Sequence, residues 1–172
     1  TGTDIGAGIL PNVELAQEAG LAVDNGIVVD EFARTSDPDI VAAGDCTKHH
    51  NFIFDLDLRL GSVQNAHDQA KVAAATLCGK LQRYDALPWF WSDQYDLKLQ
   101  IAGLSQGFDD VVIRGDIAGS RKFAAFYFKG DKLLAVDAVN SPKEFMQARR
   151  ILSAKLSVSK ADAANPDFDL SK

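Results

Sequence analysis

The chemistry that this sequence could perform is most visible at Gly44 and Asp45, which directly follow a short apolar run, residues 40–43. We predict this run as a buried strand that places the Asp45 carboxylate at its C-terminal end, where ligands bind in open α/β sheets. The neighbouring glycine leaves room for a ligand to approach the backbone. An ionised carboxylate only accepts hydrogen bonds, so it suits the hydroxyls of a ribose or another polyol. The alternative is a strand that runs into an acidic surface turn, because this pattern is common.

A second candidate group is the backbone amide of Val63, at the start of a predicted helix. Ser62 is a suitable N-cap and Gly79 supplies the C-terminal stop. The first amides of a helix lack intrahelical acceptors and carry the positive end of the macrodipole, so the Val63 amide could stabilise an anionic ligand edge. The inner face predicted from helical spacing consists of Val63, Ala66, Ala70, Ala73, Ala74 and Leu77. An ordinary, tightly packed core helix would show the same alanine-rich face.

Other reactive residue types do not form a recognisable constellation. His49 and His50 are adjacent, and adjacent side chains on a strand point to opposite faces, so we expect surface or hydrogen-bonding roles rather than metal binding. Cys46 and Cys78 form neither a CxxC pair nor a metal cluster, so we expect reduced thiols in a cytoplasmic protein. We predict no catalytic base, nucleophile or metal ligand in this chain.

The composition is that of a globular protein with a net charge of −6, and no apolar run approaches the roughly 20 residues of a membrane helix. Residues 1–47 carry nine acidic side chains and one basic one, whereas residues 114–155 carry nine Lys or Arg and four Asp or Glu. This basic region is too mixed in sign to indicate nucleic-acid binding.

Residues 1–82 read as α/β structure. We predict a helix capped by Asn12 that buries Leu15, Ala16 and Ala19 and ends at Gly20, followed by a short strand at residues 27–29. Residues 46–60 are expected to be irregular.

A domain boundary is predicted near residues 81–88, after which the pattern becomes α+β. Strands are expected at residues 97–102, 111–114, 123–128 and 133–139, with a tight hairpin turn at residues 129–132. The residues Ser141, Pro142 and Glu144 predict a helix start with a capping box. Strands followed by a helix indicate an α+β domain with an antiparallel sheet, and residues 158–172 are expected to be a poorly ordered tail.

Several of these segments together resemble one enzyme family. Residues 35–46, which end in Gly44-Asp45-Cys46, resemble the second flavin-binding motif of the FAD-dependent pyridine-nucleotide oxidoreductases. Residues 8–12 (GILPN), with 15–16 and 19–21, resemble the segment that closes their NAD(P)H domain. Residues 61–66 (GSVQNA) and 88–95 (PWFWSDQY) resemble the ferredoxin reductases of oxygenase systems, which serve putidaredoxin, rubredoxin or the ferredoxins of aromatic-ring dioxygenases. The resemblance runs from about Gly6 to about Leu152.

The resemblance implies a flavoprotein that passes electrons from NAD(P)H through FAD to an iron–sulfur ferredoxin or rubredoxin. It implies that residues 1–33 end the NAD(P)H-binding domain, that 34–82 belong to the FAD-binding domain, and that 83–157 form the reductase C-terminal domain. The family's glycine-rich fingerprints are expected before residue 1, because Gly6-Ala7-Gly8 runs into Pro11 where a third glycine is needed. The chain would then be the C-terminal portion of a longer enzyme.

By the same resemblance, Gly44, Asp45, Val63 and Trp91 are the expected cofactor residues. Asp45 would bind a ribityl hydroxyl of FAD, the Val63 amide would face the flavin, and Trp91 would cover the flavin on the side of the redox partner. Lys71 is a candidate docking residue for an acidic ferredoxin, about 12 Å along the helix from Val63. Trp91 could instead form a hydrophobic hinge with its neighbours, and Lys71 could be an ordinary surface lysine.

Two other readings stay open. A disulfide reductase would carry a His-Glu pair in its C-terminal domain, but all three histidines precede residue 68. A reading of another class is a non-catalytic α+β scaffold or dimerisation module that holds little or no flavin on its own.

Overall fold

The computed structural model describes residues 9–171, so residues 6–8 of the family-like segment lie outside the described part. The chain divides into two compact units, residues 1–86 and 87–172, and the division falls within the predicted boundary segment 81–88. Each unit is described here by itself. In residues 9–171, no helix has the length and apolar character that crossing a membrane requires.

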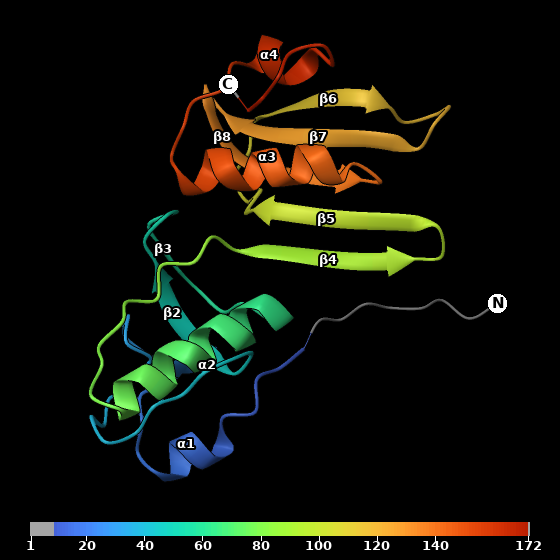
Figure 1. Cartoon of the computed structure of the whole chain (residues 1–172). Coiled ribbons are helices and arrows are strands. Elements are labelled where there is room, and N and C mark those ends of the chain that lie inside the picture. The colour runs from blue at the N-terminus through green and yellow to red at the C-terminus, as the bar shows by residue number, and fades with distance from the viewer. Residues whose placement is uncertain (1–8, 172) are drawn as a thin grey trace, which may run out of the picture. The chain divides into compact units, whose positions relative to one another are not determined.

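The first unit is built around a small mixed sheet and one long helix (Figure 1). Strand β1 (Ile27–Val28) pairs in parallel with β2 (Thr47–Asn51), and β2 pairs antiparallel with β3 (Leu56–Leu58). The helices are α1 (Glu14–Glu18) and α2 (Val63–Leu77). A small apolar core joins Ala33 and Tyr84 to Val72 and Ala73 of α2.

Two predicted elements of this unit are wrong in detail. Residues 40–43 do not form a strand but a single bridge between Val41 and Arg34, because the chain doubles back at Asp37 and pairs with residues 33–35. The strand beside Gly44 and Asp45 is β2, which follows them inside the segment expected to be irregular.

Helix α1 also departs from the prediction. It begins after Val13 rather than Asn12, has no side-chain cap, and buries Ala16 while Leu15 is 83% exposed. Gly20 follows the helix with the positive φ of +74° that suits a C-terminal stop.

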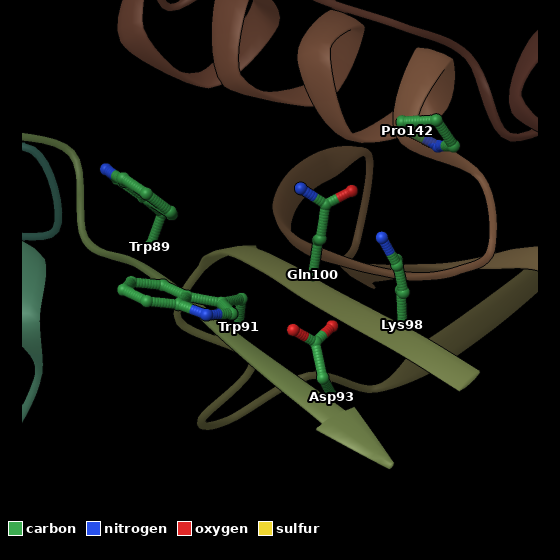
Figure 2. Close-up of a pocket in the computed structure, with 6 residues that line it drawn as sticks. All are labelled: Trp89, Trp91, Asp93, Lys98, Gln100 and Pro142. Atoms are coloured by element: carbon green, nitrogen blue, oxygen red, sulfur yellow. The ribbon is translucent and has the colours of Figure 1, made fainter. Parts of the chain in front are cut away.

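The second unit is a five-stranded antiparallel sheet with helices, which confirms the α+β class predicted for it. Its strands lie in the order β4-β5-β8-β7-β6. They are β4 (Trp89–Gln94), β5 (Leu97–Gly103), β6 (Asp110–Asp116), β7 (Lys122–Lys129) and β8 (Lys132–Val139). Side chains of β4 and β5, among them Trp91 and Gln100, stand on one side of this sheet (Figure 2).

Helix α3 (Pro142–Ser153) lies across the sheet over β5 and β8 (Figure 1). Its buried side chains include the predicted stripe, which consists of Phe145, Ala148, Ile151 and Leu152. The predicted capping box does not form, because the Ser141 hydroxyl donates to the carbonyl of Val139 and the Glu144 carboxylate lies 3.6 Å from the Arg114 guanidinium. Gly103 of β5 permits a close approach: a Cβ there would lie 2.2 Å from the carbonyl oxygen of Leu134.

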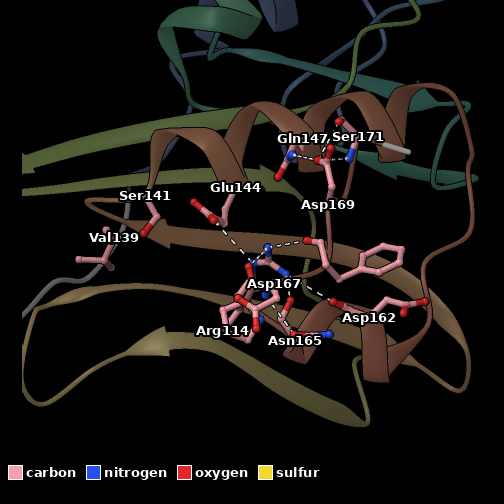
Figure 3. A network of polar contacts seen from close by, with 12 residues as sticks. Arg114, Val139, Ser141, Glu144, Gln147, Asp162, Asn165, Asp167, Asp169 and Ser171 are labelled. Atoms are coloured by element: carbon pink, nitrogen blue, oxygen red, sulfur yellow. Dashed lines mark hydrogen bonds and ion pairs between the residues drawn. The ribbon is translucent and has the colours of Figure 1, made fainter.

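The C-terminal segment is ordered, contrary to the prediction of a loose tail. Helix α4 (Lys160–Ala164) begins at Ser159, whose hydroxyl accepts the amide of Asp162 at 3.0 Å. The buried guanidinium of Arg114 donates to the carbonyls of Asp162, Asn165, Pro166 and Phe168 (Figure 3). The hydropathy pattern gave no sign that this segment packs against the sheet, because the contact is made by the charged side chain of Arg114 with main-chain carbonyls.

We predict that Arg114→Met lowers the free energy of unfolding of the second unit by about 3 kcal/mol, since it leaves four part-buried hydrogen bonds to carbonyls unmade and removes the partner of Glu144. Limited proteolysis should then cut first between residues 158 and 171. The control is Arg121→Met, which removes only an exposed ion pair with Asp96 and should cost under about 1 kcal/mol. Equal effects of the two substitutions would contradict the anchoring role.

Candidate cofactor site

The turn at Gly44 is fixed by buried polar side chains. Gly44 has a φ of +93°, which L-residues rarely adopt, and its amide donates to Oε1 of Gln69 at 2.7 Å. The carbonyl of Gly44 accepts the amide of Thr47 at 3.0 Å, and the Thr47 hydroxyl lies 2.8 Å from both this carbonyl and Gln69 Oε1. Gln69 and Thr47 are almost fully buried, so these bonds form away from solvent.

This turn lies against the first turns of α2. A Cβ built on Gly44 would lie 3.7 Å from Cβ of Ala66, and one built on Gly61 would lie 3.7 Å from Oδ2 of Asp45. Asp45 is therefore held beside the residue that precedes the N-cap. Its carboxylate is exposed and has no hydrogen bond or ion pair with any residue in the range 9–171.

The start of α2 is held in place by the side chain of Asn65. The Ser62 hydroxyl accepts the Asn65 amide at 3.1 Å, as expected of an N-cap, and Asn65 Nδ2 donates to the carbonyl of Leu60 at 3.0 Å. The hydroxyl of Tyr84 donates to Asn65 Oδ1 at 2.7 Å. Burial raises the pKa of Tyr84 to about 12, so this donor keeps its proton at neutral pH.

The Val63 amide is left free at the end of this framework. Val63 is 67% exposed, and its amide has no acceptor among the residues that the structure describes. Together with the helix macrodipole it presents a donor and partial positive charge within two residues of Gly61, where the Asp45 carboxylate lies. The structure thus brings Asp45 and Val63 to the same end of α2, one as an acceptor and the other as a donor.

The buried face of α2 differs from the predicted one. Val63 and Leu77 are more than two-thirds exposed, and Ala70 and Ala74 also face solvent. The buried residues are Gln64, Asn65, Gln69, Val72 and Ala73. A prediction from hydropathy chose the wrong side of α2, because Asn65 and Gln69 are polar residues that are buried through hydrogen bonds. The spacing of four between them was the one feature of the sequence that indicated a shared helix face.

We expected His49 at the surface or in a hydrogen bond, but it is buried beside Tyr84. It is 3% exposed, packs edge-on against Tyr84 with ring centroids 5.0 Å apart, and neither ring nitrogen has a partner in the described chain. Burial lowers its pKa to about 4. His50 behaves as expected, with its ring nitrogens 2.9 Å from Asp57 and 3.3 Å from Asp55. Residues 9–171 contain no group of three or more His, Cys, Asp or Glu side chains placed to hold a metal ion.

The two remaining candidates belong to other elements than this turn. Lys71 is exposed on α2 with its Nζ 3.7 Å from a carboxylate oxygen of Asp68. Trp91 belongs to the second unit, where it is 38% exposed and lines a groove of about 430 Å³ (Figure 2). The rest of the groove lining is Trp89, Asp93, Lys98, Gln100 and Pro142.

Comparison with known proteins assigns the family. A model described as pyridine nucleotide-disulphide oxidoreductase matches residues 4–70, and one described as reductase C-terminal matches residues 89–172. The chain belongs to the pyridine nucleotide-disulphide oxidoreductases. Its matching relatives among them are ferredoxin reductases, so the resemblance seen in the sequence motifs is confirmed.

The chain is 51% identical to putidaredoxin reductase CamA of Pseudomonas putida, over 89% of this chain and 36% of that protein. A crystal structure of the ferredoxin reductase for the CYP199A2 system of Rhodopseudomonas palustris matches with 49% identity and a TM-score of 0.92, over 96% of this chain and 41% of that one. A covalent putidaredoxin reductase–putidaredoxin complex matches with 48% identity and a TM-score of 0.90, over 95% and 39%. This chain therefore spans about two fifths of the length of these relatives.

We predict that His49 makes the first unit sensitive to acid. Its pKa is about 4 when folded and has the ordinary value of 6.5 when unfolded, so the unfolded chain binds an extra proton between these values. Stability should fall as the pH drops from 6.5 towards 4, by up to about 3 kcal/mol, and be unaffected by this residue above pH 6.5.

Hydrogen exchange of the β2 and α2 amides as a function of pH measures this loss. His49→Phe should flatten the dependence, whereas His67→Gln, at an exposed position, should leave it unchanged. An unchanged pH dependence in His49→Phe would show that another group is responsible.

Proposed function

We propose that this chain is part of a flavoprotein reductase that passes electrons from NAD(P)H through FAD to a ferredoxin or rubredoxin that feeds an oxygenase. The observation that carries the proposal is the Asp45 carboxylate held beside Gly61, two residues before the Val63 amide at the start of α2, with neither group bonded to a residue in the range 9–171. The match to a reductase solved with its putidaredoxin partner supports the class of electron acceptor.

The residues at this site fit FAD. Asp45 offers an exposed acceptor for a ribityl hydroxyl, and Val63 offers an unsatisfied donor for a carbonyl or anionic edge. Gly44 and Gly61 carry no side chain that would obstruct the approach. When bound, FAD supplies the redox chemistry, taking a hydride with its two electrons from the nicotinamide and passing the electrons singly to two iron–sulfur partners.

The role of this chain is then to position FAD and to adjust its reduction potential. The Val63 amide and the α2 macrodipole favour negative charge at the flavin N1/C2=O edge, which stabilises the reduced cofactor. A contribution of about 1 kcal/mol corresponds to tens of millivolts for a two-electron couple. None of the proposed site residues needs to act as a general base.

The proposal assigns the chain to three functional parts. Residues 1–33 end the NAD(P)H-binding domain, 34–82 belong to the FAD-binding domain, and 83–157 form the reductase C-terminal domain. The tail is 158–172, of which residues 162–168 are held through Arg114. Trp91 would cover the flavin on the partner's side, and Lys71 would attract an acidic partner. We place the activity in the cytoplasm, where Cys46 and Cys78, both free in the structure, stay reduced.

Replacing Asp45 tests the cofactor assignment. In the flavin-loaded reductase that contains this chain, Asp45→Ala should weaken FAD binding by about 10- to 100-fold, because a hydrogen bond to a charged group is lost. Flavin absorbance retained after gel filtration measures this loss. The control is Asp39→Ala, which removes an exposed carboxylate of the same segment and should change nothing.

Unchanged flavin affinity in Asp45→Ala would show that the carboxylate does not bind the cofactor. A colourless wild-type reductase, with no flavin to retain, would instead favour the reading of a non-catalytic scaffold.

We predict that Trp91→Ala slows electron delivery to the iron–sulfur partner by about tenfold, the value of one aromatic contact, and affects hydride uptake from NADH less. Stopped-flow absorbance separates the two half-reactions. Phe90→Ala is the matched control, because Phe90 is 43% exposed on the opposite side of the same strand and does not line the groove. Equal slowing of both half-reactions would reject a partner-side role for Trp91.

A further inference from the structure

Arg149 of α3 is in contact with the aromatic side chains that lead to Trp91. Its guanidinium carbon lies 4.8 Å from the ring centroid of Trp89 and 5.6 Å from that of Phe145. Phe145 lies four residues earlier, so both side chains occupy the same face of the helix. A guanidinium at these distances from an indole is within cation–π range. The cation–π attraction is stronger where solvent is partly excluded, as at the half-buried Arg149.

Trp89 links this helix face to Trp91. Its ring centroid is 5.9 Å from that of Phe145 and 5.5 Å from that of Trp91, with an angle of 30° between the two indole planes. Its cross-strand neighbour is Ala102, whose small side chain is fully buried and leaves room for the indole over β5. The row therefore runs from the buried Phe145 through Trp89 to the exposed Trp91 at the groove.

Trp91 depends on this row for its orientation. In the described part of the chain, its ring contact is with Trp89, while its other surroundings are the groove and the cross-strand Gln100 (Figure 2). A tryptophan on an outer strand with a groove beside it is free to change rotamer unless a neighbour restrains it. Trp89 supplies that restraint, and the guanidinium of Arg149 on α3 packs against the ring of Trp89.

We propose that Arg149 is a positioning residue, which holds the indole of Trp91 in its functional orientation by clamping Trp89 against Phe145. The functional part of this inference rests on the proposed function, in which Trp91 covers the flavin on the partner's side. Arg149 acts here through its contact with an aromatic face, not as a docking charge.

Circular dichroism tests the clamp without any flavin. The indole rings of Trp89 and Trp91 lie 5.5 Å apart, so the coupling of their transitions gives a far-UV exciton couplet that reports their mutual orientation and is isolated by the difference between variant and wild-type spectra. Arg149→Met keeps the aliphatic stem but removes the charge, and it should abolish or strongly reduce the couplet. Arg149→Lys keeps a cation and should retain most of it.

The matched control is Arg150→Met. Arg150 is the next residue of α3 and donates to the carbonyl of Ser171 rather than to an aromatic ring, so its loss should leave the couplet unchanged. A couplet that survives in Arg149→Met, or that falls equally in Arg150→Met, overturns the clamp.

The kinetic arm uses the flavin-loaded reductase. Arg149→Met should slow electron delivery to the iron–sulfur partner by about tenfold, the factor that a cation–π contact of ordinary strength corresponds to, with hydride uptake unchanged. Arg149→Lys should restore it. A lost couplet with normal electron delivery overturns the functional part of the inference, because Trp91 would then not need its orientation. A wild-type reductase that reduces no iron–sulfur partner refutes the proposed function instead. In that case the exciton couplet still tests whether Arg149 orients the two indoles.

Discussion

The buried amide side chain of Gln69 ties the Gly44 turn to helix α2, and the geometry of the candidate site follows from this tie. Its Oε1 accepts the Gly44 amide at 2.7 Å at a position where the glycine has a φ of +93°. A buried backbone donor left without a partner costs about 1–3 kcal/mol, so the turn cannot move along the helix without a penalty. Because the turn is fixed, the carboxylate of the next residue, Asp45, is held beside Gly61, two residues before the Val63 amide.

A second layer of polar side chains fixes the helix start itself. Tyr84, Asn65 and Ser62 form a continuous chain of hydrogen bonds from the interior to the N-cap. Fully satisfied buried networks of this kind favour one arrangement, since each broken bond strands a polar group in a medium of low dielectric constant. The site therefore resembles a rigid frame with an acceptor and a donor at its open end.

The sequence predicted those parts of the fold whose signals are local. Four of the five strands of the second unit follow from their apolar runs and from the turn between Lys129 and Lys132, whereas β4 was not predicted. The stripe of α3 follows from its spacing. Strand β2 was missed because Thr47, His49 and Asn51, its inward residues, are polar although they are buried. The apolar run before Gly44 was read as a strand because its pairing partner, only a few residues upstream, could not be seen from hydropathy.

The candidate site shows the same difference between local sequence signals, which can be recognised, and contacts between distant residues, which cannot. Gly44, Asp45 and Val63 could be proposed as candidates from the sequence because a Gly-Asp pair and a serine-capped helix are local patterns. Gln69 and Tyr84, which hold them, act on partners 25 and 19 residues away, and no periodicity links such pairs. His49 was misplaced because a buried histidine without hydrogen-bond partners contradicts the usual behaviour of the residue.

The anchor at Arg114 has a consequence for how this protein can vary. Its guanidinium binds main-chain oxygens of the terminal segment, and these are present whatever the amino acid. The anchor itself therefore makes no demand on the side chains at the four positions whose carbonyls it binds, whereas Ala163 and Leu170 of the same segment are buried and are constrained by packing. A single arginine on a strand can in this way fix the path of a segment by its main chain, independently of the amino acid at each bonded position.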